Sequence, residues 1–365
     1  MRERALPALV GAALGIAILL WSGGLFAPQH RSVRAPFSHN TRFPRIVKDV
    51  MPSVVMVMSL APAVDKEEDG VETGFMEKLW RRFKGVWAPA YKVISQGSGV
   101  VIDKRGHIVT NHHVIAKGER VLVKLGNPEV EVNATLIGVD PMTDLALLKI
   151  SSGRTLAPVT FADSKKLMPG QWVMAIGNPF TFKGSVTAGV ISALGRSNIG
   201  IVDIEDYIQT DVKIFPGNSG GPLLDIDGKV IGITTAVYGL GYGIGFAIPS
   251  SEVIYVVDSL IRNGRVDRGK IGVTAQAVTH DLAISFNAPD SGGALVVTVE
   301  DGSPSQLAGV LRGDIITSFD GQSVQSPREL RRFALKSHPG ENVRMDIIRS
   351  GEPVIVSVKI GSLYK

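Results

Sequence analysis

Residues 216–222 read PGNSGGP, a run in which one hydroxyl lies among three glycines, an asparagine and two prolines. A tight turn needs one or two glycines, so two interpretations are open. In the first, the run is a loop between strands and Ser219 is solvated. In the second, the glycines clear space so that a carbonyl group can reach the Ser219 hydroxyl and the bare N–H groups beside it. The second interpretation predicts a nucleophile that needs partners elsewhere in the chain.

The composition is that of a globular protein of about two domains, with 365 residues, 44% hydrophobic and 20% charged. The net charge is +5, but Lys and Arg are scattered, so we predict no nucleic-acid partner. The chain has no Cys, which excludes disulfides, thiolate nucleophiles and Cys-type zinc sites. His, Asp and Glu show no metal-ligand spacing, so we predict neither a metal nor a cofactor.

The N-terminal residues 5–28 carry no charge and are long enough to cross the ~30 Å hydrocarbon core of a bilayer as a helix. The alternative is a cleaved signal peptide, whose apolar region is usually shorter, ~7–15 residues, and ends at a small-x-small site. Here Ala27 follows Phe26 and precedes Pro28. We therefore expect residues 1–28 to be an uncleaved membrane anchor. Arginines lie on both sides of the segment, so charge leaves its orientation open.

Residues 29–45 are polar and punctuated by proline, which predicts a linker. From Val47 onward, short β-type runs alternate with turn residues, which favours a mainly β domain over residues 46–250, either a sandwich or a barrel. Residues 74–87 interrupt this pattern with helical spacing and a basic face. This predicted helix packs on its own domain or a sister subunit, or else contacts a membrane surface.

Residues 250–264 are typical of a helix with an N-cap serine and a terminal glycine. This helix ends the β domain, and residues 251–267 serve as the connecting helix and linker. Residues 268–362 form a second, smaller unit of mixed strand and helix.

A serine hydroxyl is a weak nucleophile that needs an imidazole to take its proton and an acid to orient that imidazole. Three histidines fall in the predicted β domain: His107, His112 and His113. The last two are adjacent, so on a strand they would point to opposite faces and only one could serve. For the acid, Asp144 opens an apolar run and should be partly buried, whereas Asp140 precedes a proline and is typical of a turn. The residues alone leave base and acid open.

Three motifs in the order His, Asp, Ser resemble the HtrA family of serine proteases: TNHHVI (110–115), TDLALLKI (143–150) and GNSGGPLL (217–224). The segments between them also fit: SQGSGVVID (95–103), PGQWVMAIGNP (169–179) and YGIGFAIP (242–249). The resemblance covers residues 46–362. It implies a mainly β fold, a chymotrypsin-like double β-barrel protease domain followed by one PDZ domain.

The resemblance also assigns roles. It implies His113 as general base, Asp144 as the residue that orients it, and Ser219 as nucleophile. The oxyanion hole would consist of the backbone N–H groups of Gly217 and Ser219, with Asn218 between them. Losing one such donor typically costs ~10²–10³ in rate.

One stretch departs from the family pattern. Lys213-Ile214-Phe215 stands where relatives commonly have Ala-Ile-Asn. Ile214 is kept and is expected to line an apolar substrate pocket. Phe215 replaces a polar residue beside the oxyanion loop, so the loop geometry or its regulation is expected to differ.

Residues 302–324, GSPSQLAGVLRGDIITSFDGQSV, resemble the PDZ signature, and residues 268–273, RGKIGV, resemble its carboxylate-binding loop. The resemblance implies that Lys270, Ile271, Gly272 and Val273 bind a peptide C-terminus. Successive N–H groups there can receive the carboxylate while the peptide adds a strand to the sheet edge. The alternative is a glycine turn that merely joins two elements.

A single anchor, protease domain and PDZ domain resemble the DegS-like branch of the family. This implies an ATP-independent, membrane-anchored serine endopeptidase of envelope quality control or stress signalling, whose PDZ domain senses C-terminal peptides of misfolded proteins. It also implies a homotrimer in the bacterial inner membrane, with both domains in the periplasm, and a regulatory relay through Arg196. The alternative is a PDZ-based chaperone or adaptor with an idle protease domain, in which Ser219→Ala leaves function intact.

Overall fold

The computed structural model describes residues 39–364 apart from 64–90, 127, 179–183, 239–242 and 289–291. The predicted membrane anchor (1–28) and the predicted basic helix (74–87) therefore lie outside the described residues. Among the helices that are described, none has the length and apolar character needed to span a bilayer.

Helix α2 (His39–Val50) precedes the first strand and leads into a 3₁₀ turn, η1 (Met51–Ser53). The segment predicted as a linker up to residue 45 is therefore helical over 39–45. Ile46 and Val50, one helical turn apart, are buried, and Ile46 lies against the turn at Gly228. Pro44 lies inside the helix, and its presence is what made the stretch appear irregular in the sequence.

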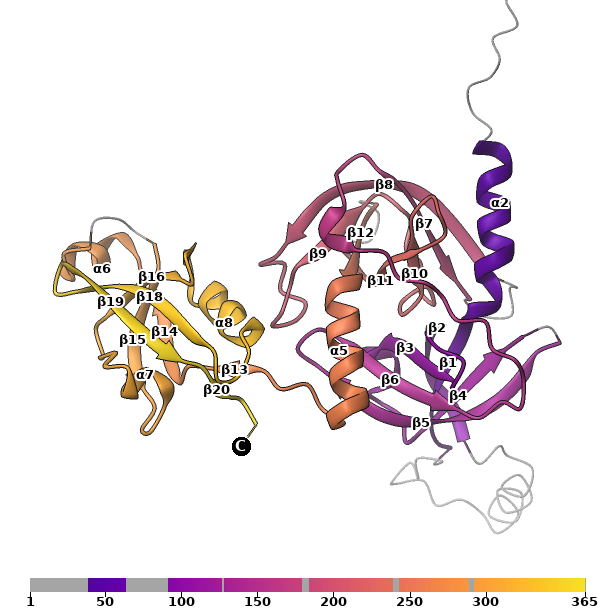
Figure 1. Cartoon of the computed structure of the whole chain (residues 1–365), viewed down its shortest axis with the longest axis horizontal. Helices are drawn as coiled ribbons and strands as arrows, with labels where there is room; N and C mark the ends of the chain where they lie inside the picture. The colour runs from indigo at the N-terminus through magenta and orange to yellow at the C-terminus, as the bar shows by residue number, and fades with distance from the viewer. Residues whose placement is uncertain are drawn as a thin grey trace, which may run out of the picture. The chain divides into compact units, whose positions relative to one another are not determined.

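The first barrel closes through the strand order β1-β2-β3-β6-β5-β4 (Figure 1). Its strands are β1 (Val54–Pro62), β2 (Tyr91–Val101), β3 (His107–Asn111), β4 (Arg120–Leu125), β5 (Val130–Asp140) and β6 (Leu145–Ile150). Inward-facing Val, Ile and Leu side chains fill it, and Val55, Ile108 and Leu148 are fully buried. Closing a sheet into a barrel requires the strands to tilt relative to the barrel axis and their register to stagger.

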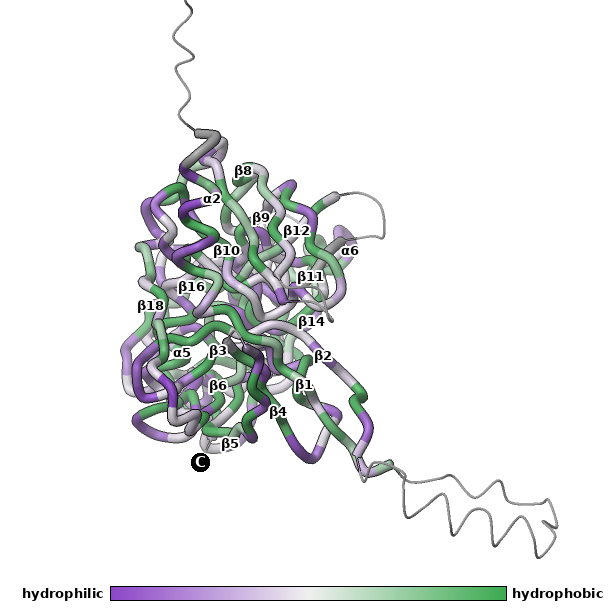
Figure 2. The backbone as a smooth tube through the Cα atoms, turned by 90° about the vertical axis from the view of Figure 1, so that its right-hand side faces the viewer, coloured by the Kyte–Doolittle hydropathy of each residue, from purple (hydrophilic) through white to green (hydrophobic). Residues whose placement is uncertain are grey.

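The second barrel closes in the order β10-β11-β12-β9-β8-β7. Its strands are β7 (Trp172–Gly177), β8 (Ser185–Arg196), β9 (Tyr207–Thr210), β10 (Pro222–Leu224), β11 (Val230–Tyr238) and β12 (Ile244–Pro249). Val173, Ile191 and Ile231 are among its buried core residues. Figure 2 shows hydrophobic residues recurring along the barrel strands. The predicted mainly β fold with a double barrel is confirmed.

Helix α5 (Ser250–Asn263) follows the second barrel, and Gly264 ends it in the left-handed region (φ 69°), as predicted. The predicted N-cap is wrong, because Pro249 occupies that position. The Ser250 hydroxyl instead donates to the carbonyl of Ala162 (2.6 Å). The carbonyl of Ala162, a partly buried residue packed against the core of the second barrel, therefore takes the hydroxyl that the sequence pattern had assigned to the helix end.

The C-terminal unit is a PDZ-type sheet with the order β14-β15-β16-β18-β19, in which β17 pairs with β16 and β13 with β20. Its strands are β13 (Gly269–Lys270), β14 (Val273–Ala277), β15 (Ala294–Val299), β16 (Ile315–Phe319), β17 (Gln322–Ser323), β18 (Asn342–Arg349), β19 (Glu352–Lys359) and β20 (Gly361–Ser362). Its helices are α6 (His280–Ser285), α7 (Pro304–Leu307) and α8 (Pro327–Lys336). Strand β14 lies at the end of the sheet order, which leaves an edge that an added strand can pair with.

Candidate active site

The two adjacent histidines lie on a helical turn and not on a strand. Strand β3 ends at Asn111, and His112 begins the short helix α4 (His112–Ile115). The His113 ring Nδ1 lies 2.6 Å from Asp144 Oδ2, and its backbone N–H donates to Asp144 Oδ1 (2.9 Å). The structure therefore brings His113 to Asp144, while the backbone N–H of His112 donates to the Asp144 carbonyl (3.0 Å).

Asp144 is held in one orientation by the groups around it. Its side chain is 8% exposed, against 50% for His113, and its backbone lies in the left-handed region (φ 64°), which is uncommon for a residue with a Cβ. Asn111 Nδ2 donates to its carbonyl (3.0 Å). Thr235 Oγ1 donates to its Oδ2 (2.7 Å). Together with the ring and the backbone N–H of His113, Thr235 gives the carboxylate three hydrogen bonds, which fix its plane relative to the His113 ring.

Thr235 also contacts the predicted nucleophile, because the Ser219 hydroxyl donates to the Thr235 carbonyl oxygen (3.2 Å). Within the described part of the chain, no hydrogen bond joins Ser219 to His113. Thr235 is not among the residues predicted from the sequence. The one available signal was the pair of threonines that interrupts the apolar run of β11, where the pairing with β12 is irregular between residues 234 and 236.

The loop that carries Ser219 leaves two of its N–H groups without acceptors. The N–H groups of Asn218, Gly220 and Gly221 donate to backbone carbonyls at 2.8–2.9 Å. In the described ranges, the N–H groups of Gly217 and Ser219 have no such acceptor. Gly217 has φ 97°, a conformation that glycine adopts without strain. Two unpaired N–H groups separated by one residue form an arrangement that can bind an oxyanion.

Asp140 is not an exposed turn residue, although a turn does begin there. Its side chain is 1% exposed and pairs with the equally buried guanidinium of Arg268, which also bonds Glu252 (3.0 Å). Burial by itself lowers the pKa of Arg268, but the carboxylates of Asp140 and Glu252 outweigh it and hold the pKa above its ordinary value. Asp140 is thus occupied in an ion pair and unavailable to orient a histidine.

The third candidate base, His107, is paired away from Asp144. Its Nδ1 lies 2.7 Å from Asp103 Oδ2 across the hairpin that joins β2 and β3. Burial raises the pKa of Asp103, but hydrogen bonds from His107 and Arg105 more than offset it and hold the pKa below its ordinary value. This pair connects the two ends of the turn between β2 and β3.

The residues of the Lys213-Ile214-Phe215 stretch differ in exposure. Ile214 is 9% exposed and Phe215 is 50% exposed. A Cβ added at Gly245 would lie 2.8 Å from Ile214 Cδ1, so the absence of a side chain at Gly245 makes room for Ile214. The Arg196 Nε donates to Gln209 Oε1 (2.7 Å) across strands β8 and β9.

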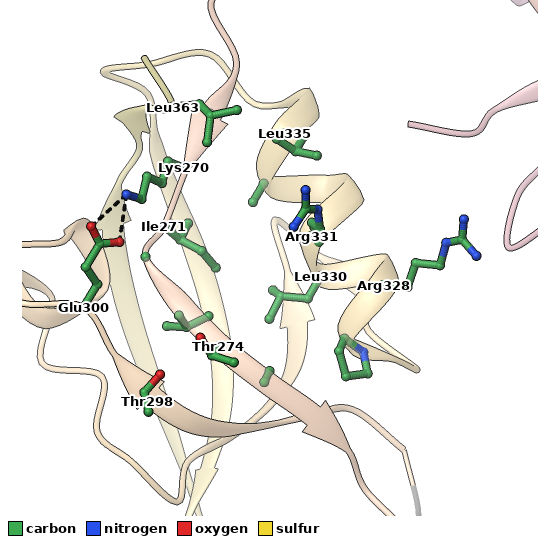
Figure 3. Close-up of a pocket in the computed structure, with 16 residues that line it drawn as sticks. Lys270, Ile271, Thr274, Thr298, Glu300, Arg328, Leu330, Arg331, Leu335 and Leu363 are labelled. Carbon is green, nitrogen blue, oxygen red and sulfur yellow. Dashed lines mark hydrogen bonds and ion pairs between the residues drawn. The ribbon is translucent and has the colours of Figure 1, made fainter. Parts of the chain in front are cut away.

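A groove of about 500 Å³ lies between β14 and α8, and the predicted carboxylate loop is at one end (Figure 3). Ile271, Leu330 and Leu335 line it, and the Lys270 ammonium pairs with Glu300 (2.7 Å) beside the loop. Gly272 has φ 77°, and a Cβ there would come within 2.3 Å of Ser303 Cβ. Among the described residues, no carbonyl accepts from the N–H groups of Ile271 and Gly272. The groove can therefore receive a carboxylate and an apolar side chain.

Two protein families match the chain. The model of the trypsin-like peptidase domain matches residues 97–233, and the model of the PDZ domain matches residues 269–360. As for metals, the described residues contain no group of three or more His, Asp or Glu side chains placed to hold one.

Two curated relatives share the name "Probable periplasmic serine endoprotease DegP-like". The Rhizobium meliloti protein is 44% identical over 272 residues, which is 74% of this chain and 54% of the relative. The Chlamydia trachomatis protein is 39% identical over 337 residues, which is 87% of this chain and 67% of the relative. The chain thus spans about half the length of the first of these. A solved structure, the HtrA-type protease AlgW with a decapeptide, has a TM-score of 0.72 and 32% identity, covering 88% of this chain and 99% of AlgW.

Proposed function

Because the chain belongs to the HtrA family of serine proteases, we propose that it is a serine endopeptidase with Ser219 as nucleophile, His113 as general base and Asp144 as the residue that orients the base. The observation that carries this proposal is the buried Asp144 carboxylate. It accepts from the ring and backbone of His113 and from Thr235. Thr235 in turn accepts from Ser219, so one connected network contains all three proposed catalytic residues.

In this proposal, Asp144 sets the direction of proton transfer. An ionised carboxylate only accepts hydrogen bonds, so the proton of the His113 ring resides on Nδ1, 2.6 Å from Asp144. Nε2 then keeps its lone pair and can take the proton of Ser219 as the hydroxyl attacks a peptide carbonyl. The imidazolium later gives this proton to the leaving amine, and water hydrolyses the acyl-enzyme by the same route.

The negative charge of the tetrahedral intermediate needs donors that are already in place. The unpaired N–H groups of Gly217 and Ser219, on either side of Asn218, supply them in this proposal. Ile214, which is nearly buried, would line an apolar pocket for the substrate residue before the cleaved bond. The exposed Phe215 adds a second apolar surface beside it, which favours cleavage after apolar residues.

The PDZ groove gives the proposed regulation. A peptide would add to the free edge of β14, with its carboxylate on the N–H groups of the Lys270–Val273 loop and its last side chain in the apolar groove. The hydrogen bond from Ser219 to Thr235, in place of one to His113, suits a resting state that a bound peptide would release. The pair formed by Arg196 and Gln209 would take part in that relay.

The cellular setting is part of the proposal. We place the protease and PDZ domains in the periplasm, as the names of the relatives suggest, with residues 1–28 as an anchor in the inner membrane and a homotrimer as the assembly. No ATP is needed, because hydrolysis through an acyl-enzyme is itself downhill. The substrates would be misfolded or regulatory envelope proteins.

The test uses the full chain in detergent with casein and apolar peptides as substrates, with and without a panel of free C-terminal peptides. Wild type, Ser219→Ala and Gly272→Val are compared. We expect cleavage that a peptide stimulates, that Ser219→Ala abolishes, and that Gly272→Val no longer couples to peptide. Cleavage that does not depend on peptide would overturn the proposed regulation by the PDZ domain but not the proposed Ser219-dependent hydrolysis. Cleavage that persists in Ser219→Ala would overturn Ser219 as the nucleophile. No cleavage at all while peptides still bind would replace the enzyme with a PDZ-based adaptor.

A further inference from the structure

Ser98 lies on β2 of the first barrel, yet it holds the loop of the second barrel that carries the proposed nucleophile. It is fully buried, with 0% exposure. Its backbone N–H donates to the Ser219 carbonyl (2.8 Å), and its hydroxyl donates to the Gly217 carbonyl (2.6 Å). Ser98 therefore holds, through their carbonyl groups, both residues whose N–H groups would bind the oxyanion.

The direction of the hydroxyl's hydrogen bonds follows from the chemistry of its partners. The backbone N–H of Asn178 lies 2.9 Å from Ser98 Oγ and can only donate, so the oxygen accepts there. The single hydroxyl proton is then available for the Gly217 carbonyl, which can only accept. Thr110 Oγ1 donates to the Ser98 carbonyl (2.7 Å), so Ser98 is itself held in place from β3.

The bond from the Ser98 hydroxyl acts on one peptide plane. The Gly217 carbonyl and the Asn218 N–H belong to the same planar peptide group. The Ser98 hydroxyl donates to the oxygen of this group. The N–H of the same group, that of Asn218, donates to the Phe215 carbonyl (2.9 Å). Gly217 lies at φ 97°, a conformation that glycine populates about as readily as negative φ. Anchoring the plane that follows Gly217 therefore limits how far the preceding plane, which carries the Gly217 N–H, can turn.

We propose that Ser98 is a positioning residue of the oxyanion hole. Its hydroxyl fixes the Gly217–Asn218 peptide plane so that the Gly217 N–H points to the place where negative charge develops. This inference rests on the proposed endopeptidase activity and adds to it a residue from the other barrel that acts through the loop.

The test compares Ser98→Ala with a matched variant, Ser250→Ala, in the full chain with a saturating stimulatory peptide. Removing an oxyanion donor outright costs about 10²–10³ in rate, so a donor that is present but unanchored should cost about 10- to 100-fold in kcat, with KM within about threefold. Ser250 is also 0% exposed and also donates a 2.6 Å hydrogen bond to a carbonyl, that of Ala162. Its loss should leave kcat unchanged.

A peptide boronic acid, which forms a tetrahedral adduct on the serine, separates positioning from general damage. In Ser98→Ala the inhibition constant of the boronic acid should rise by the same factor by which kcat falls, because both depend on the oxyanion donors. A scanning calorimetry trace gives the folded fraction at the assay temperature, and rates are corrected for it. Unchanged kcat and boronate affinity would overturn the proposal, as would equal corrected losses in Ser98→Ala and Ser250→Ala.

Crystal structures of wild type and Ser98→Ala give a readout that does not require hydrolysis. We expect the Gly217 carbonyl to leave its position against residue 98 in the variant, with the Gly217 N–H turned from the site. An unmoved Gly217–Asn218 plane would overturn the role of Ser98 even if both proteins cleave peptides. A wild type that cleaves nothing would instead overturn the proposed function, and the loop geometry would still decide the role of Ser98.

Discussion

Replacing Arg268 by Met should cost about 3–5 kcal/mol of stability, the range typical of removing one partner from a buried ion pair. The side chains of Arg268 and Asp140 are each 1% exposed. Once the guanidinium is gone, the Asp140 carboxylate keeps the Thr143 hydroxyl (2.7 Å) as its side-chain donor in the described ranges. A buried carboxylate is then left with most of its charge uncompensated, and Glu252 loses a 3.0 Å partner as well.

Differential scanning calorimetry of the full chain measures this loss. For a domain of about 150–250 residues, each kcal/mol lowers Tm by roughly 2–4 °C, so the protease transition should fall by roughly 6–20 °C. Arg262→Met on helix α5 is the control, because its side chain is 72% exposed and its contact with Asp258 spans 3.7 Å. An exposed pair of this kind contributes about 0–1 kcal/mol, so Tm should hardly move.

The double variant Asp140→Asn/Arg268→Met distinguishes an orphaned charge from lost packing. Removing both charges leaves no unpaired carboxylate, so at least half of the single-variant loss should be recovered. A cost below about 1 kcal/mol for Arg268→Met would contradict an orphaned buried charge. So would a double variant as unstable as the sum of two independent losses.

Three further predictions concern the site and its frame. Thr235→Val removes one hydrogen bond from the Asp144 carboxylate, and because such charged hydrogen bonds contribute about 1.5–3 kcal/mol, kcat should fall about 10-fold or more, measured with an apolar peptide substrate. Gly220→Ala, at φ 85°, would place a Cβ 2.1 Å from a backbone oxygen and should abolish soluble folded protein. The control Gly153→Ala, at φ 63° with nothing within 4 Å of the added Cβ, should cost only about 1 kcal/mol of stability, measured by calorimetry. Asp103→Asn should be less stable than wild type at pH 7. Hydrogen bonding depresses the pKa of this carboxyl in the folded state. The stability that the carboxylate contributes is therefore present above its ordinary pKa of about 4 and is lost as the pH falls through the folded-state pKa. The difference in unfolding midpoint between wild type and variant should shrink below about pH 4.

The sequence alone indicated the mainly β class, because short alternating runs and turn residues act locally along the chain. The resemblance of its motifs to the HtrA family also assigned His113, Asp144 and Ser219, in that order, whereas the residues alone left base and acid open. The structure brings the first two together at 2.6 Å and connects the third to them through Thr235. Helix α2 was not predicted from the sequence, because an interior proline such as Pro44 normally ends a helix.

Other features depended on contacts that no local pattern carries. Asp140 has the sequence context of a turn residue, but it is buried in an ion pair with a guanidinium 128 residues away. Ser250 has the context of a helix cap, but its hydroxyl donates to the carbonyl of Ala162, 88 residues away. In both cases a local preference gave way to a buried polar group that required a partner.

The contacts around the nucleophile were decided only by the tertiary structure. Thr235 reaches Asp144 across 91 residues, and Ser98 reaches Gly217 across 119 residues. A threonine or serine in an apolar strand has the same local pattern whether or not its hydroxyl holds a catalytic loop. Closure of the two barrels brings these hydroxyls to their acceptors, and burial then makes each hydrogen bond necessary, because an unpaired polar group away from water costs more than the bond itself contributes.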